Sequence, residues 1–467
     1  METHFTPCRR PLPLGFLNAL AQRFGPACQT GDAIREQHGA SESQYPTVAP
    51  DAVVYATSTQ DVVDCVNLCR EAGVAIVPYG AGTSLEGHTL PLEGGVSLDM
   101  SRMDAVLAVN HADFDCTVQP GIRREALNAY LRDTGLFFPI DPGANATIGG
   151  MASTRASGTN AVRYGTMREV VLGLEVVTAQ GKVIRTGRRA KKSAAGYDLT
   201  RLYIGSEGTL GVITGITLRL NPVPEAILAA ICPFETLAGA VETVVQAFHC
   251  SVPMARIELL DAMQVRAVNL RSKLGLPEVP TLFFEFHGSA AGVADQVETV
   301  KALAAANGGG EFQWATLAED RNRLWRARHE AYYAAVNLRP GAIGLTTDVC
   351  VPMSRLAECI LATRAELDQC SVPATIVGHV GDGNFHLIFS IDPNAPHEMA
   401  EVEALNHRMV ARALAMDGTC TGEHGIGIGK QQCLIDELGE DAVDVMRTLK
   451  RALDPDNLFN PGKIFRI

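Results

Sequence analysis

Short apolar runs and helix-spaced apolar residues alternate along the first part of the chain. Runs at 52–56 and 74–77 have the length and the β-branched content of buried strands. Between them, segment 59–72 places apolar residues at helical spacing behind Thr59 and Asp61, residue types that suit the start of a helix. The pattern therefore predicts a strand, a helix and a strand in succession near the N-terminus.

The same periodicities continue along the rest of the chain. Before Pro222 we expect further strands at 96–99, 105–109, 116–118 and 214–220, helices near 15–24 and 124–134, and a hairpin of 170–178 with 182–186. After Pro222 we expect strands near 228–232, 255–259, 281–285, 346–351 and 374–391, and helices near 236–248, 292–306, 320–338, 354–369, 396–416 and 441–453. The second set indicates antiparallel strands with helices on one face, and the fold class is α+β.

A chain of 467 residues exceeds what one hydrophobic core usually supports, so two or three domains are expected. The Pro222–Pro224 stretch marks one boundary. We therefore divide the chain into a lead-in (1–45), a first domain (46–223), a second domain (224–418) and a C-terminal segment (419–467).

Charge and cysteine content exclude several classes of protein. The formal net charge of −12 argues against a nucleic-acid partner, which would favour a basic face. No apolar run approaches the ~20 residues of a membrane-spanning helix, and no signal peptide is expected. The twelve cysteines form no Cys-x-x-Cys pair, which indicates free thiols in a reducing compartment. We expect a cytoplasmic protein, with peripheral attachment at the inner membrane as the alternative.

The stretch 378–386 carries the strongest chemical signal. Gly381 to Asn384 have the composition of a four-residue turn between two apolar runs. Such a turn would place His379 directly opposite His386. Opposed residues on antiparallel strands have Cβ atoms ~4.5–5.5 Å apart and point to one face, so the two imidazoles could share a metal ion.

A third ligand is offered by the Gly-bounded turn that contains Glu423 and His424. Two histidines and one carboxylate with a position left open have the composition of a catalytic zinc site. Zn²⁺ is the expected ion, with Mn²⁺ as the alternative. His424, adjacent to the carboxylate, is the candidate proton acceptor. The alternative is that these histidines are hydrogen-bonded structural residues.

Three tracts rich in small residues precede Pro222, at 78–89, 141–158 and 205–213. Glycine and hydroxyl residues directly after a strand let backbone N–H groups approach a phosphate. Gly80-x-Gly82 does not continue into the dinucleotide fingerprint, because Leu85 stands where a third glycine is needed, so a nicotinamide domain is disfavoured. Three tracts together suit an extended nucleotide that carries a bulky ring, although each alone could be a tight connection.

The order of these motifs resembles that of the vanillyl-alcohol oxidase / p-cresol methylhydroxylase (PCMH) flavoproteins. The similarity extends from about residue 45 to residue 467 and is strongest to the branch of FAD-linked D-2-hydroxyacid dehydrogenases. It implies a PCMH-type FAD-binding domain of two subdomains over 46–223, an antiparallel-sheet cap domain over 224–418, and a C-terminal helical segment that returns to the flavin.

The resemblance also implies which residues contact FAD. By matching motifs these are Pro78, Gly80, Ala81, Gly82, Thr83, Ser84, Gly87, Pro142, Gly143, Thr147, Gly149, Gly150, Ser153, Gly158, Gly208, Ile213 and Asn460. Relatives that tether the flavin use a histidine where Thr83 or Ser84 stands here, so the FAD is expected to be noncovalent.

The same resemblance implies an assignment for the catalytic groups. His379, His386 and Glu423 match the metal ligands, His424 matches the base, and Arg328 matches the residue that binds the substrate carboxylate, for which a bidentate guanidinium is well suited. Asn384 is assigned to substrate binding.

The expected reaction is oxidation of a short D-2-hydroxy acid, D-lactate to pyruvate in the first place. Thr346 occupies the position where relatives that take dicarboxylates have a lysine, so a second carboxylate would find no partner. Glycolate or D-2-hydroxyglutarate dehydrogenase is the alternative. Further alternatives are an alkylglycerone-phosphate synthase, which would use FAD to make an ether bond without the metal, and a metal- or nucleotide-binding protein without catalysis. Electrons would pass to cytochrome c, a quinone or an electron-transfer flavoprotein, and a homodimer is left open.

Overall fold

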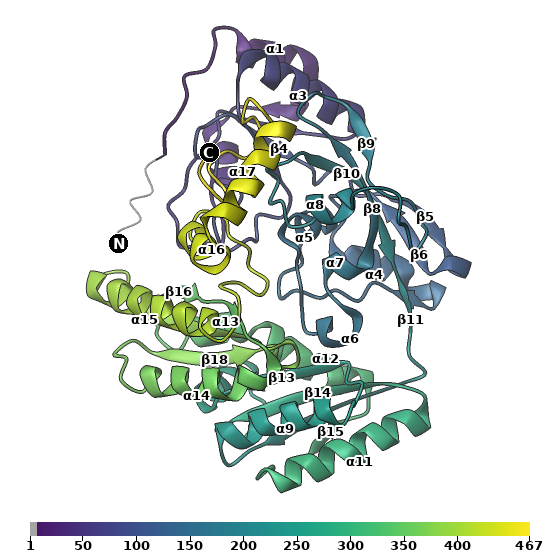
Figure 1. Cartoon of the computed structure of the whole chain (residues 1–467), viewed down its shortest axis with the longest axis vertical. Coiled ribbons are helices and arrows are strands. Elements are labelled where there is room, and N and C mark those ends of the chain that lie inside the picture. The colour runs from purple at the N-terminus through teal and green to yellow at the C-terminus, as the bar shows by residue number, and fades with distance from the viewer. Residues whose placement is uncertain (1–6) are drawn as a thin grey trace. The chain divides into compact units, whose positions relative to one another are not determined.

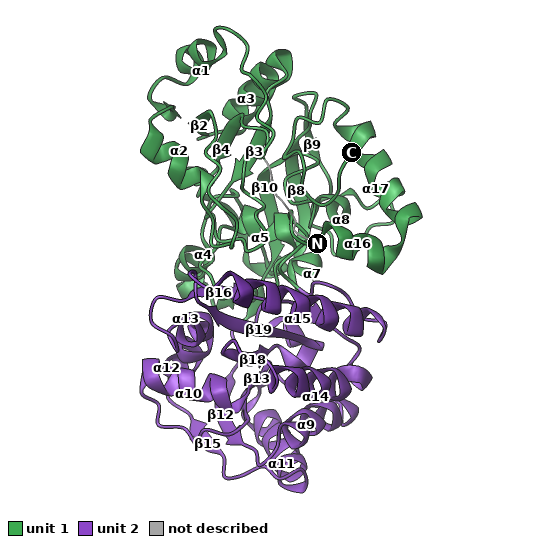
Figure 2. Ribbon diagram, turned by 90° about the vertical axis from the view of Figure 1, so that its left-hand side faces the viewer, with its two compact units in different colours: residues 1–157, 166–222, 423–467 green, residues 158–165, 223–422 purple. Residues whose placement is uncertain are grey.

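The computed structural model describes residues 7–467 and divides into two compact units (Figures 1 and 2). Unit 1 comprises the chain through Ser157, Thr166–Pro222 and Glu423–Ile467, and unit 2 comprises Gly158–Gly165 and Val223–Gly422. The chain passes from unit 1 to unit 2 after Pro222, within the expected boundary at Pro222–Pro224. The short excursion Gly158–Gly165 into unit 2 has no counterpart in the sequence pattern. Residues 1–6 of the expected lead-in lie outside the described residues.

The first sheet of unit 1 has the strand order β1–β2–β4–β3, with β2, β4 and β3 parallel and β1 antiparallel. Its strands are β1 (Cys28–Gln29), β2 (Ala52–Tyr55), β3 (Ile76–Tyr79) and β4 (Val96–Asp99), accompanied by α1 (Phe16–Phe24), η1 (Gly25–Ala27), α2 (Asp32–Gly39) and α3 (Thr59–Ala72). The Ser58 hydroxyl accepts a hydrogen bond from Asp61 N at 3.2 Å and caps α3, and Gly73 at φ 66° ends it. The buried face of α3 consists of Val62, Cys65, Val66 and Cys69. Val63 and Leu68, which the apolar spacing also assigns to this face, are partly buried.

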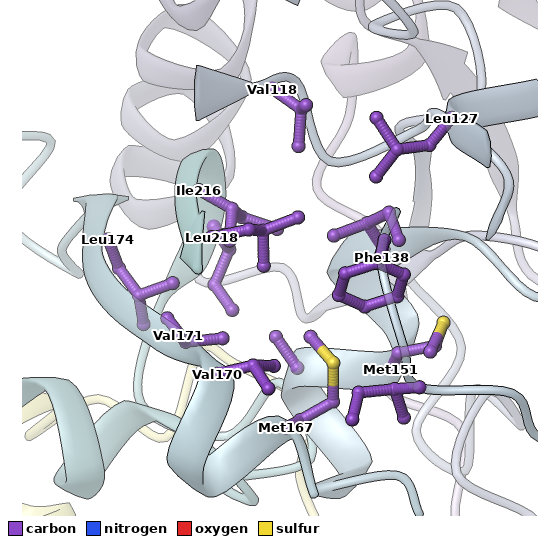
Figure 3. Packing of buried hydrophobic residues seen from close by; sticks show 14 of the residues in the cluster. Val118, Leu127, Phe138, Met151, Met167, Val170, Val171, Leu174, Ile216 and Leu218 are labelled. Atoms are coloured by element: carbon purple, nitrogen blue, oxygen red, sulfur yellow. The ribbon is translucent and has the colours of Figure 1, made fainter. Parts of the chain in front are cut away.

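The second sheet of unit 1 is antiparallel, in the order β5–β6–β10–β8–β9. Its strands are β5 (Val106–Asn110), β6 (Asp115–Val118), β8 (Val171–Val177), β9 (Val183–Arg185) and β10 (Val212–Arg219), and the pair β7 (Leu136–Phe137) and β11 (Asn221–Pro222) lies apart. The associated helices are η2 (His111–Asp113), α4 (Arg124–Leu131), η3 (Arg132–Thr134), α5 (Ile148–Thr154), α7 (Met167–Val170) and α8 (Leu199–Tyr203). Figure 3 shows how Ile216 and Leu218 of β10 pack with Phe138 and Met151 in the core of this subdomain.

The C-terminal residues complete unit 1. After α16 (Gln431–Leu438) and α17 (Glu440–Leu453) the chain runs beside β3, where Ile76 N donates to Leu458 O at 2.8 Å and Asn460 N donates to Ile76 O at 2.8 Å. The buried Lys450 ammonium donates to Phe459 O at 2.9 Å and fixes the same segment. The last residues are therefore an integral part of this fold.

Unit 2 is built on one antiparallel sheet of eight strands, in the order β15–β12–β14–β13–β18–β19–β16, with β17 also paired to β19. Its strands are β12 (Ala226–Pro233), β13 (Arg256–Leu260), β14 (Thr281–Gly288), β15 (Gln313–Ala315), β16 (Ile343–Thr346), β17 (Val349–Cys350), β18 (Ala374–Gly378) and β19 (Asn384–Ile391). Its helices are α6 (Ala161–Tyr164), α9 (Leu237–His249), α10 (Ala262–Ser272), α11 (Ala290–Ala306), α12 (Ala318–His329), α13 (Ala331–Val336), η4 (Met353–Arg355), α14 (Leu356–Leu367), η5 (Val380–Asp382) and α15 (Pro396–Leu414).

The expectation of helices on one face of this sheet is wrong, because helices cover both faces (Figure 2). Helices α10, α12 and α13 pack on the face that carries Phe283 and Val377, whereas α9 and α11 pack against the strands from the other side. The physical reason is visible in β14, where residues of both alternating sets are buried from Thr281 to His287. A strand buried on both faces needs cover on both.

Among residues 7–467, no helix is both long and apolar enough to cross a membrane.

Candidate metal and substrate site

The turn between β18 and β19 lies one residue earlier than the sequence suggests, so the expected pairing of His379 with His386 is wrong. His386 is paired with Val377, and Asn384 N donates to His379 O at 3.3 Å across the end of the turn. Gly383, at φ 77°, closes a loop whose last position needs a left-handed backbone. The pairing is displaced by two residues, and because side chains alternate with a period of two, both histidines still point to the same face.

The two imidazole rings lie close together at the end of the sheet. Their centroids are 5.5 Å apart and their planes are at 83°. Both rings are buried, and the Nδ1 atom of each is engaged by an oxygen acceptor, Glu258 Oε1 at 2.7 Å from His379 and Thr347 O at 3.0 Å from His386. Since a carboxylate and a carbonyl can only accept, both Nδ1 atoms carry the proton. The Nε2 atoms are therefore the nitrogens suited to coordinate a metal.

Glu423 joins the two histidines. Within residues 7–467, one atom each of His379, His386 and Glu423 lie within 4.8 Å of one another, a separation that one ion could bridge. The peptide bond ties Glu423 to Gly422, which ends unit 2. A Cβ atom added at Gly422 would lie 2.2 Å from Asn384 Nδ2, so only glycine permits this approach. Two imidazoles and one carboxylate fit a divalent ion such as Zn²⁺.

Asp348 and Asn384 lie beside the segment that precedes Glu423 in the candidate metal group. Asn384 Nδ2 donates to Asp348 Oδ1 at 2.7 Å and to Val349 O at 2.8 Å, and the Thr421 hydroxyl donates to Asp348 Oδ2 at 2.6 Å. The Asn384 amide hydrogens are thus used within the protein. Asn384 therefore stabilises the segment beside Gly422. Only its side-chain carbonyl oxygen would remain to contact a substrate.

His424 lies next to Glu423, with Nε2 at 3.8 Å from Glu423 Oε1. Beyond it, Glu207 anchors the returning chain, because its buried carboxylate accepts hydrogen bonds from Ile426 N at 2.7 Å and Gly427 N at 2.8 Å. Burial alone would raise the pKa of Glu207, but the nearby His88 and these N–H groups hold the pKa below its usual range. The turn with the candidate base is therefore held in place just beyond Gly425.

Arg328 is buried on α12 and is already paired with an acid. Its Nε and Nη2 atoms lie 2.8 Å and 2.5 Å from Glu258 Oε2. Glu258 is thus shared between the candidate substrate-binding arginine and the candidate metal ligand His379. A substrate carboxylate would be received by the remaining edge of the guanidinium.

The nucleotide tracts of unit 1 contact one another. A Cβ atom added at Gly80 would lie 2.3 Å from Thr147 Oγ1, and one added at Gly208 would lie 3.3 Å from Pro78. Asn460 Nδ2 donates to Glu207 O at 2.8 Å, which ties the C-terminal motif to the third tract. Glycine at positions 80 and 208 lets these tracts pack closely against one another.

The other expected FAD residues fall on the same tracts. Gly82 and Gly87 have φ of 71°, a conformation that favours glycine. Gly149, Gly150 and Ser153 lie in α5, and Ile213 is buried in β10. Ala81, Thr83, Ser84, Pro142 and Gly143 lie in the irregular segments that follow β3 and precede α5. Gly158 differs from the rest, because it opens the segment that belongs to unit 2.

Sequence reasoning missed Glu258, Glu207 and the supporting role of Asp348. A signal for Glu258 was present, since an acid between Ile257 and Leu259 in a predicted strand must be buried with a partner or be exposed. Glu207 gave no comparable signal, because it reads as one residue of a glycine-rich loop. The partners of these acids come from distant parts of the chain.

Comparison with known proteins identifies the class. Residues 223–464 match the C-terminal domain of FAD-linked oxidases, and residues 50–187 match an FAD-binding domain. The 4-ethylphenol oxidase of Gulosibacter chungangensis is similar in structure, with a TM-score of 0.81 at 18% identity. The match covers 98% of this chain and 99% of the oxidase chain. p-Cresol methylhydroxylase gives a TM-score of 0.78 at 17% identity. The chain belongs to the FAD-linked oxidases, and the expected PCMH-type α+β fold is confirmed.

The relatives narrow the class further. The chain is 51% identical to "Probable D-lactate dehydrogenase, mitochondrial" of Danio rerio, over 94% of this chain and 88% of the relative. It is 49% identical to "D-lactate dehydrogenase [cytochrome], mitochondrial" of Arabidopsis thaliana, over 89% and 73%. "Glycolate oxidase subunit GlcD" of Bacillus subtilis is 35% identical over 89% of each. The chain is thus an enzyme of the FAD-linked D-lactate dehydrogenase family.

Proposed function

We propose that this enzyme oxidises D-lactate to pyruvate at a divalent metal held by His379, His386 and Glu423, with noncovalent FAD as the oxidant. The observation that supports this best is the pair of Nδ1 hydrogen bonds, 2.7 Å and 3.0 Å long, that leave the Nε2 atom of each histidine suited to one ion. A merely structural histidine pair would not need a carboxylate from a separate segment within 4.8 Å.

The chain's own residues supply binding and proton transfer. Arg328 receives the substrate carboxylate, and His424 accepts the proton of the α-hydroxyl as the Cα–H bond breaks. A divalent ion bound at the three ligands would lower the pKa of that hydroxyl. Bound FAD would take up the two electrons and the hydrogen of Cα as hydride, which balances the conversion of lactate to pyruvate. The electrons then leave to an acceptor other than NAD, and a cytochrome is favoured because it appears in the name of the Arabidopsis relative.

The substrate pocket should favour a small monocarboxylate. Thr346 ends β16 and offers no positive charge for a second carboxylate, which would then be desolvated without a partner. Glycolate is the second candidate, favoured by the 35% identity to the Bacillus glycolate oxidase subunit, and differs from lactate by one methyl group. A missing methyl contact changes affinity by ~1–3 kcal/mol.

The test is anaerobic reduction of the bound flavin by single substrates. D-lactate should bleach the yellow colour of the oxidised flavin, L-lactate and D-2-hydroxyglutarate should not, and glycolate should act more slowly. Dialysis against a chelator should remove this reduction while the FAD stays bound, and added Zn²⁺ or Mn²⁺ should restore it. Full reduction by D-lactate in metal-free protein would refute the proposed role of the metal.

A further inference from the structure

Glu258 occupies a position that connects two candidate site residues. The β13–β18 register pairs Leu260 with Val377 and Leu259 with Gly378, and continuing it by one step places Glu258 opposite His379. Opposed side chains on antiparallel strands share a face and lie within contact distance. Glu258 is 1% exposed, so its carboxylate must be satisfied by protein groups.

The two oxygens of Glu258 have different partners. Oε1 lies 2.7 Å from His379 Nδ1. Oε2 lies 2.8 Å from Arg328 Nε and 2.5 Å from Nη2. Because an ionised carboxylate accepts on both oxygens, it can hold the imidazole and the guanidinium at the same time.

We propose that Glu258 is a positioning residue that fixes the Nδ1–H tautomer of His379 and the orientation of Arg328 together. With the proton on Nδ1, the Nε2 lone pair of His379 is available to a metal. The same carboxylate holds the inner edge of the Arg328 guanidinium and leaves its outer edge to the substrate. One buried acid thereby couples the metal ligand to the group that binds the substrate carboxylate.

A glutamine at this position cannot do both tasks. Its single oxygen would turn to the Arg328 charge, and its NH₂ group would then face His379 Nδ1. To accept that hydrogen bond, His379 must carry its proton on Nε2, where it blocks coordination. Glu258→Gln preserves size and polarity, so its effect reports the tautomer and the charge.

The chain offers a matched control on the neighbouring strand. Glu285 on β14 is also buried and also lies between a histidine and an arginine, with His287 Nε2 at 2.8 Å and Arg256 Nη1 at 3.6 Å. His287 is not among the three residues of the candidate metal group. Glu285→Gln should therefore disturb unit 2 as much as Glu258→Gln does, but without an effect on metal binding.

The experiment measures Zn²⁺ and Mn²⁺ affinity of the FAD-loaded protein by titration calorimetry, for wild type and both variants. Glu258→Gln should weaken metal binding about 10–100-fold, the usual effect of losing the carboxylate behind a ligating histidine, and Glu285→Gln should stay close to wild type. Glu258→Asp, which keeps both acceptor oxygens, should recover part of the loss. Equal affinities in both glutamine variants, or equal losses, would overturn the proposal.

A second measurement is made on wild-type protein and does not depend on how well the glutamine variants fold. The sample is metal-free wild-type protein with ¹⁵N-labelled histidine. Its long-range ¹H–¹⁵N spectrum should show His379 as the Nδ1–H tautomer. The His379 signals are assigned as those that disappear in His379→Asn. An Nε2–H tautomer would contradict the proposal.

This inference rests on the proposed function, and the two can fail separately. If wild type binds no metal or D-lactate does not reduce its flavin, the proposed function fails, while the tautomer still tests the role of Glu258. If wild type reduces its flavin with D-lactate and Glu258→Gln keeps full metal affinity, only the positioning role fails.

Discussion

Unit 2 contains two buried carboxylates that have similar surroundings, but only one of them contacts a candidate metal ligand. Glu258 on β13 and Glu285 on β14 each contact one histidine and one arginine. Around Glu285 the contacts form a closed set, since Trp325 Nε1 donates to its Oε2 at 2.6 Å and the second nitrogen of His287 contacts the Tyr164 hydroxyl at 2.7 Å. Around Glu258, the histidine itself is one of the three residues of the candidate metal group.

A structural ion network and a reactive one share several properties. Burial and ion pairing are alike in both, so neither identifies a site. The distinguishing feature is the histidine: His287 uses both ring nitrogens within its cluster, whereas His379 is one of three residues whose ligand atoms lie close enough to share one ion.

Replacing the histidines should produce the largest contrast. His379→Ala should abolish metal binding and lower kcat/KM for D-lactate about 1,000-fold or more, equivalent to ~4 kcal/mol of transition-state stabilisation, with FAD retained. His287→Ala should keep metal and activity, and lower the free energy of unfolding by ~2 kcal/mol because Glu285 loses a partner. Metal content, flavin content and steady-state kinetics of both proteins check this. Equal kinetic losses would remove the distinction between the clusters.

The arginines should differ by a smaller factor. Arg328→Lys keeps the charge but loses the fork geometry, so KM for D-lactate should rise ~10-fold or more, a loss of ~1.4 kcal/mol. Arg256 lies over the Trp325 ring at 4.6 Å and donates to Asn160 Oδ1 at 2.9 Å, so Arg256→Lys should change stability and leave KM unchanged. The kinetics of flavin reduction over a range of D-lactate concentrations separate the two. A normal KM in Arg328→Lys would exclude its substrate role.

Trp325→Phe tests the closed cluster alone. It removes the indole N–H that lies 2.6 Å from Glu285 and keeps most of the ring volume. The free energy of unfolding in denaturant should fall by ~1–3 kcal/mol, because a buried carboxylate loses a donor, while metal affinity stays at the wild-type value. Weakened metal binding in this variant would show that the two clusters are coupled.

The smallest expected effect is a pH dependence of Glu285. Burial would raise its pKa, but Arg256, His287 and Trp325 outweigh burial and hold the pKa below its usual value of 4.5. An acid with a lowered folded-state pKa stabilises the fold above its unfolded pKa, and this contribution is lost as the pH falls through the folded value. The stability difference between wild type and Glu285→Gln should therefore shrink below pH ~4.5. Glu298→Gln, at a side chain 72% exposed, should show no such trend.

Much of this architecture follows from local patterns in the sequence. The α3 helix, strand β4 and the strands on either side of the histidine turn were predicted because apolar spacing and turn residues act over a few positions. The sequence pattern predicts the turn itself one residue too late, since Gly381, Gly383 and Asn384 all suit a turn. Only the partners of Asn384 in unit 2 assign it to β19. The error did not separate the histidines because a two-residue displacement preserves the face.

Other features could not be predicted because their causes are distant in sequence. Helices on both faces of the large sheet depend on how segments pack after the chain has folded. The excursion Gly158–Gly165 is joined to unit 2 by contacts such as Asn160 with Arg256 and Tyr164 with His287, whose sequence separations exceed any local pattern. The candidate ligands could be listed from the sequence, but the acids that orient them could not.

The pairing of the C-terminal residues with β3 has a consequence for how the protein is made. Ile76 acquires its partners Leu458 and Asn460 only when residues 458–460 have left the ribosome. Every residue of unit 2 has been synthesised once Gly422 is joined, so unit 2 can mature first. Unit 1 includes residues before and after unit 2, so it receives these partners of β3 only after unit 2 has been synthesised, and a chain that stops before residue 458 would lack them.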